Sequence, residues 1–534
     1  MSQTSTSNAA GPNPNPNPNP AQASASGEGQ GSHRGLITVA IILATIMQTL
    51  DSTIANVALP HMAGNLSASQ DQISWVLTSY IVAAAIATPL TGWLSGKYGR
   101  KKVFMTSVVG FTIASALCGI SGTLAEIVLA RLLQGLFGAA LVPLSQAVML
   151  DINPRHKHAQ AMAVWGMAVM IGPILGPTLG GWLTDNLTWR WVFFINLPIG
   201  VLSFLGIKAY IRETKTQPEL KFDYLGCITL SLSIGFLQMF LDRGELLDWF
   251  NSTEIVIEAT CAAVSFAYFI VLTATAQGLS FFNVQLLKDR NFVTGLALYF
   301  MVGLLLYATR ALLPPLLQTL LGYPVVTAGL VIGPSGIGTM MSMMMAGRLA
   351  SRIDPRALIG LGFCLTALSL WQMSGYTFVM QQSDIVWPGF IQGLGLGFVS
   401  VPLTTMTFST LAPHLRPDGT SIFSLSRNIG SSIGISVMQT LVTRNTGTFH
   451  SQLVEHINYA NPAMQAGLPW LYNLGTQAGA AALNEEITRQ AAFLAYINDF
   501  KIMMVATLVS VPLVLLMRRQ RGNLGPEVEA HALD

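Results

Sequence analysis

Charged side chains are scarce in this chain. Asp, Glu, Lys and Arg account for 10% of its 534 residues, against ~25% in a typical soluble protein. Hydrophobic residues make up 51%, and the mean hydropathy is +0.52. This balance excludes an ordinary soluble domain. The net charge is only +3, so the sequence also lacks the strongly basic surface of a nucleic-acid-binding protein.

Cysteine is rare as well, and its positions exclude two further classes of protein. All four cysteines fall within long hydrophobic runs, so we expect neither a disulfide framework nor a cysteine-bound metal: Cys118, Cys227, Cys261 and Cys364. The same runs hold no cluster of His, Asp and Glu and no His-Glu-x-x-His sequence. They therefore offer no metal site and little basis for a membrane-embedded enzyme.

Long hydrophobic runs are what the sequence has in abundance. Each is about 20 residues long, the length of helix that crosses a ~30 Å hydrocarbon layer. Fourteen such runs predict an all-α polytopic membrane protein. The predicted spans cover approximately residues 36–59, 73–94, 103–121, 124–149, 159–183, 191–210, 225–241, 255–275, 292–317, 325–346, 357–376, 385–409, 419–443 and 500–517.

The basic residues between these spans lie mostly on one side. With a cytoplasmic N-terminus, 20 Lys and Arg residues fall on the cytoplasmic side and 5 on the outer side. This split follows the positive-inside rule and predicts that both termini are cytoplasmic. Residues 1–34, with an Asn-Pro repeat, and residues 519–534 are predicted to be tails. Residues 444–499 are predicted to form a polar outer loop with a helix around Glu485 to Tyr496.

One carboxylate stands within the first hydrophobic run. Burying the ionised Asp51 in a bilayer costs roughly 2.5 to 3.5 kcal/mol, so such an acid indicates a site for protons, ions or substrate. Arg131, in the fourth span, is predicted to lie at the same depth, ~10–12 Å below the outer surface. The two can pair. Attraction by Arg131 favours the ionised acid and burial favours the protonated one, which is the competition that a protonation switch requires. A static structural ion pair is the alternative.

Two glycine-containing stretches favour close contacts between helices. The loop between spans two and three contains Gly92, Gly96, Gly99 and Arg100, and its small residues and cations suit the approach of neighbouring helix ends. The fifth span presents glycines at i, i+4 and i+8 beside a stripe of prolines: Gly172, Gly176 and Gly180, with Pro173, Pro177 and the adjoining Gly181. Ordinary positive-inside charge and simple helix packing are the alternative interpretations.

Together these stretches resemble the fourteen-span drug:proton antiporters of the major facilitator superfamily, of the EmrB type. The loop around Gly92 is similar to the superfamily's signature loop, although Gly96 stands where that pattern carries an acid, which argues against its charge relay. Residues 129–140, around Arg131, match the superfamily's arginine-containing motif. The doubled Gly-Pro pattern resembles the motif that distinguishes proton-coupled antiporters.

The resemblance implies a fold and an activity. It implies two six-helix bundles, at residues 35–215 and 281–518, with two inserted spans at 216–280, and export of amphipathic toxic compounds by alternating access. Proton entry would drive export from the inner membrane, with Asp51 as carrier, Arg131 as its partner and no cofactor other than protons. A periplasmic adaptor (EmrA-like) and an outer-membrane channel (TolC-like) are implied partners, besides the lipid bilayer. A dedicated exporter of one endogenous metabolite, such as a fatty acid, siderophore or peptide, remains the alternative.

Substrate is expected near the midplane, where the two bundles meet. Aromatic, amide and methionine side chains suit planar apolar ligands, although each can equally belong to the core or face lipid: Gln48, Asn56, Trp75, Tyr80, Gln146, Trp165, Tyr307, Gln318, Gln392 and Met406. Arg310, where the EmrB pattern is apolar, is interpreted as a contact for an anionic substrate group, as a second partner for Asp51 or as a snorkelling side chain. Arg427 is interpreted as a gate contact.

Overall fold

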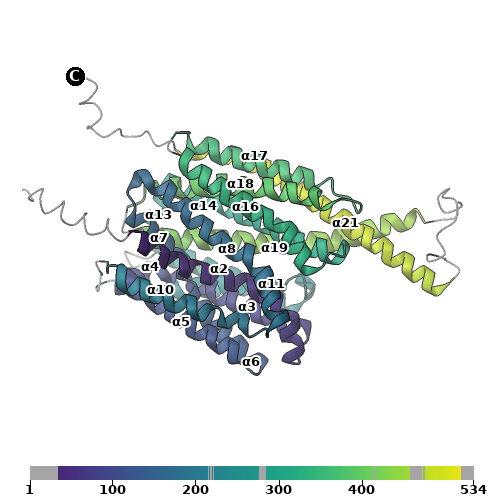
Figure 1. Ribbon diagram of the computed structural model, residues 1–534, viewed down its shortest axis with the longest axis horizontal. Coiled ribbons are helices and arrows are strands. Elements are labelled where there is room, and N and C mark those ends of the chain that lie inside the picture. The colour runs from purple at the N-terminus through teal and green to yellow at the C-terminus, as the bar shows by residue number, and fades with distance from the viewer. Residues whose placement is uncertain are drawn as a thin grey trace, which may run out of the picture.

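The computed structural model describes residues 34–214, 216, 219, 222–275, 284–350, 352–412, 415–457, 472 and 476–518. Within these ranges every regular element is helical, which confirms the predicted all-α fold (Figure 1). The predicted tails, apart from Arg34, lie outside the described residues, as does the centre of the predicted outer loop.

The first set of helices covers the first six predicted spans. Its members are α2 (Arg34–Asn65), α3 (Gln70–Ala87), α4 (Leu90–Tyr98), α5 (Arg100–Ile120), α6 (Leu124–Gly138), α7 (Leu141–Ile152), α8 (His158–Asn186), α9 (Trp191–Phe194) and α10 (Asn196–Tyr210). The second predicted span is bent, because α3 and α4 meet at 54° with Pro89 between them. Proline lacks the N–H that would continue the α3 ladder.

Two helices follow that belong to the predicted insertion. α11 (Tyr224–Arg243) and α12 (Thr253–Thr275) pack against each other, and α11 also contacts α3 and α19 (Arg416–Glu455). An ion pair between Arg243 and Glu254 joins the two helices where they approach their connection. α11 therefore lies beside both sets of helices.

The second set covers the remaining predicted spans. It comprises α13 (Gln285–Lys288), α14 (Arg290–Val302), η3 (Gly303–Tyr307), α15 (Ala308–Pro315), η4 (Leu316–Leu320), α16 (Val325–Leu349), α17 (Pro355–Met373), α18 (Gln382–Ser409), α19, α21 (Gln477–Ser510) and η7 (Pro512–Leu516). The ninth span is irregular, since η3 and η4 are π-helical segments on either side of α15. Such segments frequently occur at functional sites.

All fourteen predicted spans lie on helices. By length and composition, twelve described helices can cross a membrane, or thirteen if the bent pair α3 and α4 is one span. The remaining predicted span, residues 419–443, lies in α19. This helix is not one of the twelve, because Ser, Thr, Asn and Arg are distributed along its 40 residues.

α19 and α21 are longer than the sequence predicted. α19 continues to Glu455 and α21 begins at Gln477, so much of the predicted outer loop is helical. At 1.5 Å per residue, 40 residues span about 60 Å, twice the hydrocarbon layer. The two helices pack together and project from the bundle (Figure 1). The expected helix around Glu485 to Tyr496 lies within α21.

The two sets of helices meet along α8 and α19. α8 packs on α2 of its own set and on α16 and α18 of the other, while α19 reaches α4 and α7. In Figure 1, α8 accordingly runs between the two halves of the bundle. α8 therefore connects the surroundings of Asp51 in α2 to the second set.

Candidate transport site

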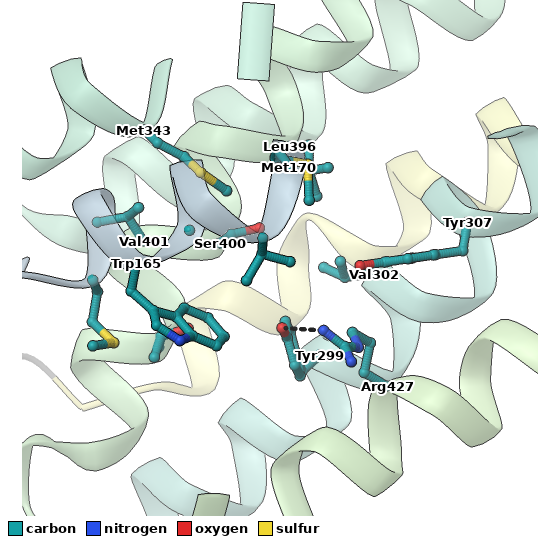
Figure 2. Close-up of a pocket in the computed structure, with 14 residues that line it drawn as sticks. Trp165, Met170, Tyr299, Val302, Tyr307, Met343, Leu396, Ser400, Val401 and Arg427 are labelled. Atoms are coloured by element: carbon teal, nitrogen blue, oxygen red, sulfur yellow. Dashed lines mark hydrogen bonds between the residues drawn. The ribbon is translucent and has the colours of Figure 1, made fainter. Parts of the chain in front are cut away.

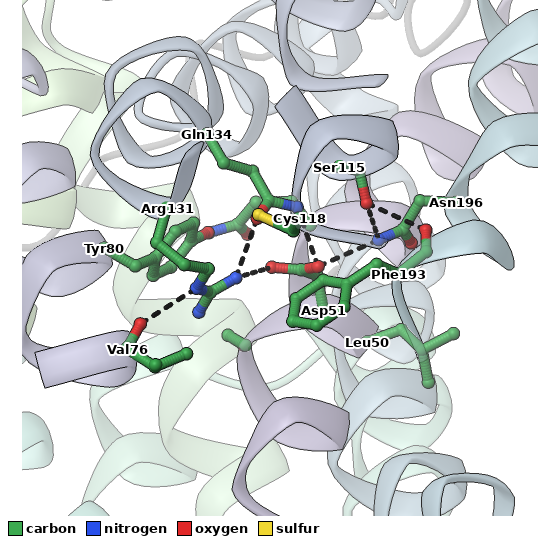
Figure 3. Close-up of polar contacts among 12 residues, drawn as sticks. Leu50, Asp51, Val76, Tyr80, Ser115, Cys118, Arg131, Gln134, Phe193 and Asn196 are labelled. Atoms are coloured by element: carbon green, nitrogen blue, oxygen red, sulfur yellow. Dashed lines mark hydrogen bonds and ion pairs between the residues drawn. The ribbon is translucent and has the colours of Figure 1, made fainter. Parts of the chain in front are cut away.

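Asp51 lies in a closed polar cluster formed by α2, α6 and α10 (Figure 3). The side chain is fully buried. Its Oδ2 accepts a hydrogen bond from Arg131 Nη1 at 2.7 Å, and its Oδ1 accepts from Gln134 Nε2 and Asn196 Nδ2, each at 2.8 Å. All three described partners of the acid are hydrogen-bond donors, so the arrangement suits a carboxylate as acceptor.

Arg131 is held from several sides. Its Nε donates to the Val76 carbonyl at 3.0 Å, its Nη1 also reaches Gln134 Oε1 at 2.9 Å, and its guanidinium lies 4.2 Å from the ring centre of Tyr80. Gln48 in turn donates to the Tyr80 hydroxyl at 3.2 Å. Tyr80 and Gln48, which the sequence offered as cavity residues, are thus placed around the ion pair.

Asn196 ends the cluster on the α10 side. Its Nδ2 also reaches Ser115 Oγ at 3.0 Å, and Ser115 donates to the Phe193 carbonyl at 2.8 Å. Asn196 Oδ1 is buried and has no hydrogen-bond partner in the described part of the chain. Sequence reasoning assigned no role to Gln134 or Asn196. The available signal was that Gln134 lies one helical turn after Arg131 and therefore on the same face.

The glycines of α8 bring this helix against α2 at the level of Asp51. A Cβ atom on Gly172 would lie 2.4 Å from the carbonyl carbon of Thr49, and one on Gly176 would lie 2.3 Å from Thr53 Oγ1. Thr53 Oγ1 is also 3.0 Å from the Gly172 carbonyl oxygen, to which it can donate. Gly180 approaches Ile54 in the same way, whereas a Cβ on Gly181 would meet nothing within 4 Å. The small-residue stripe therefore permits close backbone approach.

The opposite side of α8 faces the second set. Ile174 lies against Gly336 of α16, where a Cβ would be 2.2 Å from Ile174 Cγ1, and Pro177 approaches Gly329 of the same helix. Pro173 and Pro177 both lie inside α8. The predicted packing surface of α8 therefore has two sides. Its glycines contact α2, while Ile174 and Pro177 approach α16.

A small pocket lies between α8 and the second set. Figure 2 shows its walls, which are mainly aromatic and apolar. The lining residues are Met162, Trp165, Gly166, Val169, Met170, Tyr299, Val302, Tyr307, Met343, Leu396, Ser400, Val401, Thr404 and Arg427. A mostly apolar lining with a few polar groups is the composition found at small-molecule sites.

Two of the cavity residues proposed from the sequence, Trp165 and Tyr307, line this pocket. The others lie elsewhere. Met406 belongs to the buried core, Trp75 lies 4.9 Å from the guanidinium of Arg243, and Asn56 is exposed on α2. The remaining three are amides: Gln146 and Gln392, which are buried with Nε2 unpartnered among the described residues, and the half-buried Gln318 of η4.

Arg310 is not a second partner for Asp51. Its Nη1 lies 3.6 Å from Met170 Sδ and its Nη2 donates to Thr339 Oγ1 at 3.3 Å. Asp51 is already satisfied by α6 and α10, so that interpretation is wrong. Arg310 is instead placed behind one wall of the pocket, because Met170 lines it.

A hydrogen-bonded chain joins the pocket to α2. Trp165 Nε1 donates to Ser145 Oγ at 2.8 Å, and Thr45 Oγ1 reaches the same Ser145 Oγ at 2.9 Å. Thr45 lies on α2, less than two turns before Asp51. The pocket wall and the helix that carries the buried acid are therefore connected through α7.

Ion pairs close the bundle at the end where α2 begins. Arg100 pairs with Asp151 at the end of α7, and Arg416 Nη1 of the second set lies 2.7 Å from Asp151 Oδ1. A Cβ on Gly92 would lie 1.8 Å from Asp418 Oδ1, so α4 and α19 are also in contact. The expected acid is missing at Gly96, and Arg100 pairs instead with Asp151 of another helix.

Gly99 makes the turn that places Arg100. Its φ of +91° is favourable only for glycine, and a side chain there would also meet Glu213. Glu213 accepts from the backbone N–H groups of Lys101 and Lys102, at 3.0 and 3.2 Å, and so caps the start of α5. The predicted gating loop thus turns at Gly99 and is held there by Glu213.

Asp151→Asn is expected to weaken this closure. The substitution leaves Arg100 and Arg416 facing a neutral amide, and loss of charge-assisted hydrogen bonds of about 1.5 to 3 kcal/mol should lower transport roughly ten-fold or more. Dye efflux from energised cells would measure the change. Glu254→Gln, which breaks the ion pair with Arg243 between α11 and α12, is the control. Equal effects of the two substitutions would contradict a specific role for Asp151.

Comparison with known proteins identifies the family. A sequence profile described as the Major Facilitator Superfamily matches residues 41–435. The chain belongs to this superfamily. It is 39% identical over 501 residues to the multidrug export protein EmrB of Escherichia coli (strain K12), an alignment that covers 93% of this chain and 98% of EmrB. It is 36% identical to the fatty acid resistance protein FarB of Neisseria gonorrhoeae, covering 90% and 96%.

A solved structure shows the same fold. The human organic anion transporter MFSD10 (TETRAN) superposes with a TM-score of 0.56 and 15% identity, covering 89% of this chain and 98% of MFSD10. The predicted major facilitator fold is confirmed, and so is the resemblance to EmrB-type proteins. The chain is a multi-pass transport protein of the inner membrane and not an enzyme.

Proposed function

We propose that this protein is a proton-coupled multidrug exporter, which moves amphipathic toxic compounds across the inner membrane by alternating access. The observation that carries the proposal is the position of α8, which packs on the helix of the buried Asp51 with one side and lines an apolar pocket with the other. The 39% identity to EmrB over nearly the whole chain supports the same activity.

Protonation of Asp51 is the proposed coupling step. In the described state all three neighbours of the carboxylate donate hydrogen bonds, so a proton would leave the acid without an acceptor. A half-turn of the Asn196 amide would present Oδ1, which has no described partner, to the protonated acid. Protonation would also remove the negative charge of Asp51 that Arg131 neutralises. Proton binding thus favours a different arrangement of α2 and α6.

Movement of α2 is proposed to reach the substrate through α8. The Gly172 and Gly176 contacts are too close for the two helices to slide independently. The hydrogen bonds from Thr45 to Ser145 and from Trp165 to Ser145 add a second connection to the pocket wall. Proton binding and substrate release can therefore both shift the position of α8, as the exchange of protons for substrate requires.

The orientation follows from the positive-inside rule. The end of the bundle closed by Arg100, Asp151 and Arg416 is assigned to the cytoplasm, together with both termini. The projecting parts of α19 and α21 then lie on the periplasmic side. This extension supports the proposal that a periplasmic adaptor, followed by an outer-membrane channel, receives the exported compound.

A dedicated exporter of one metabolite is the second candidate. The specific observation in its favour is that Arg427, which lines the pocket, has no carboxylate partner among the described residues, and this suits a single class of acidic compound. The similarity to FarB, a protein named for fatty acid resistance, agrees with that chemistry.

Transport by inverted membrane vesicles tests the proposal. Vesicles that contain the protein should accumulate several unrelated amphipathic dyes when the lumen is acidified, and collapse of the pH gradient should abolish accumulation. Vesicles without the protein are the control. Accumulation that persists after collapse would contradict proton coupling, and transport of one compound alone would favour the dedicated exporter.

A further inference from the structure

Asp499 of α21 is as fully buried as Asp51, but its surroundings are of the opposite kind. Neither of its carboxylate oxygens has a hydrogen-bond partner among the described residues. Asp51 instead accepts three hydrogen bonds, one of them from Arg131. The two buried acids are therefore expected to differ in protonation.

Apolar side chains surround Asp499. Ala495 and Met503 lie one turn before and one turn after it on the same face of α21, and both are fully buried. The adjacent Phe500 is fully buried as well. Phe500 and Met503 belong to an apolar cluster to which α15 and η4 contribute Ala308, Leu312, Leu313, Leu316 and Leu317. Asp499 thus lies within a hydrophobic core of the second set.

No described cation lies beside Asp499. It takes part in no ion pair within the described ranges. On its own helix, Arg489 pairs with Glu486, and Lys501 is exposed. Among the elements packed against α21, η4 and η7 contain no titratable residue, and the charged residues of α14 and α17 lie in their first turns.

The helix with the largest contact, α19, offers no counter-ion either. Its Arg427 lies against Tyr299, with Tyr307 of η3 beside the same guanidinium. Its other charged residues lie in its first turn or in the part that projects from the bundle. The remaining titratable side chains around Asp499 are hydroxyls of the same apolar cluster, Tyr376 and Tyr496.

An ionised carboxylate is strongly disfavoured in such a place. It would lose its hydration without gaining a cation or a hydrogen bond from a described residue. A neutral carboxyl group loses far less, because it carries no net charge. Asp499 is therefore expected to hold a proton in this conformation, in which the contacts of Asp51 suit an ionised acceptor.

Asp499 lies toward the outer end of its span. It precedes Met517 by 18 residues, or about 27 Å of helix, so it is close to the outer boundary of a ~30 Å hydrocarbon layer. The positive-inside rule assigns the end at Met517 to the cytoplasm. Protons that enter from the outer side therefore meet Asp499 near the boundary.

The wall opposite α21 is locally weak. Thr309 Oγ1 of α15 lies 3.4 Å from Met503 Sδ, one turn from Asp499. α15 ends at Pro314 and Pro315, which lack backbone N–H groups, and π-helical segments flank it on both sides. The next residue, Arg310, contacts Met170 of the pocket wall. A shift of α15 can therefore open the surroundings of Asp499 and move a wall of the pocket together.

We propose that Asp499 is a second proton-binding site, which carries a proton from the outer side while Asp51 is ionised and releases it when α15 moves. The proton bonds to one carboxylate oxygen of Asp499 and later leaves to water, with no other group consumed. The claim that Asp499 binds a proton stands without the export function. The claim that this proton drives transport rests on it.

Infrared spectroscopy of the purified full-length protein tests proton binding directly. At neutral pH, where exposed carboxyl groups are ionised, Asp499→Asn should remove a protonated-carboxyl band that shifts in D₂O. Asp51→Asn should remove no such band, and neither should Asp185→Asn, whose side chain is 65% exposed in the parent. Gel filtration and thermal unfolding identify variants that fail to fold. An unchanged band in a folded Asp499→Asn protein, or its loss with Asp51→Asn instead, would overturn the proposal.

The number of coupled protons tests the role in transport. In inverted vesicles with the membrane potential held at zero, each coupled proton supports about ten-fold accumulation of a dye for a gradient of one pH unit. Asp499→Asn should therefore lower the limiting accumulation about ten-fold at that gradient. A purely structural defect would slow uptake and leave the limit unchanged. A parental limit in the Asp499→Asn protein would overturn the coupling role.

Asp499→Glu keeps this test decisive. Asparagine preserves the shape of aspartate, whereas glutamate preserves its acidity. If the folded Asp499→Asn protein moves no dye, recovery of transport with glutamate supports the coupling role, and failure of glutamate to restore it counts against that role.

The results separate the second proton site from the export function. Parent vesicles without gradient-driven accumulation would reject the proposed export function, while the infrared band would still report whether Asp499 holds a proton. Export with an unchanged limit in the Asp499→Asn protein would reject the second coupling site and leave export through Asp51 in place.

Discussion

Replacement of Asp51 by asparagine is expected to reduce gradient-driven efflux to the level seen in the parent after the pH gradient is collapsed. Asparagine has nearly the shape of aspartate, and its Oδ1 can still accept from Arg131, but it cannot bind and release a proton. Arg131 also keeps Val76, Gln134 and the Tyr80 ring as partners. The fold should therefore persist while coupling is lost. Efflux of a dye from energised cells, at matched expression, measures the effect.

The control for this substitution is Asp185→Asn. Asp185 lies near the end of α8, its side chain is 65% exposed, and its Oδ1 lies 4.0 Å from Nε2 of His61. An exposed pair of this kind contributes little, so efflux should stay at the parental level. Ligand binding without a gradient should survive in both variants. Normal gradient-driven efflux by the Asp51→Asn protein would show that Asp51 is structural and that coupling occurs elsewhere.

The span pattern was predictable because each hydrophobic run carries its own signal. A helix that crosses the bilayer must be about 20 apolar residues long, whatever it packs against. The extension of α19 and α21 was not predictable in this way. Residues up to Glu455 and from Gln477 are polar, and their helices form as a packed pair outside the hydrophobic layer.

The pocket was harder to predict than the ion pair. Asp51 and Arg131 are unusual residues in apolar segments, and depth alone placed them together. Lining a pocket depends on which face of a helix turns inward, and helices that are apolar all round give no such signal. Of the residues that line the pocket, the sequence prediction included Trp165 and Tyr307 but not Tyr299. Asp499 was assigned to the edge of an outer loop, yet it is fully buried in α21, with neither oxygen partnered among the described residues.

Gly172→Ala is expected to lower efflux at least ten-fold, whereas Gly181→Ala is expected to leave it unchanged. A Cβ on Gly172 would lie 2.4 Å from the carbonyl carbon of Thr49 and 2.5 Å from its oxygen, so α8 and α2 must separate. Backbone atoms cannot rotate away, and overpacking of this kind costs roughly 1 to 3 kcal/mol. A Cβ on Gly181 meets nothing within 4 Å. Dye efflux and thermal unfolding would be measured for both proteins.

Gly176→Ala should fall between the two. The atom nearest its Cβ is the hydroxyl oxygen of Thr53, 2.3 Å away, and rotation of that side chain removes this contact at the expense of its hydrogen bond to Gly172, while Thr53 Cβ stays 2.9 Å away. The order Gly172, Gly176, Gly181 therefore follows what each methyl group meets and not its place in the motif. If all three substitutions reduced efflux equally, general helix bending would explain the motif better than contact with α2. The expected order would instead assign the motif to the surface that transmits proton binding at Asp51 to the pocket.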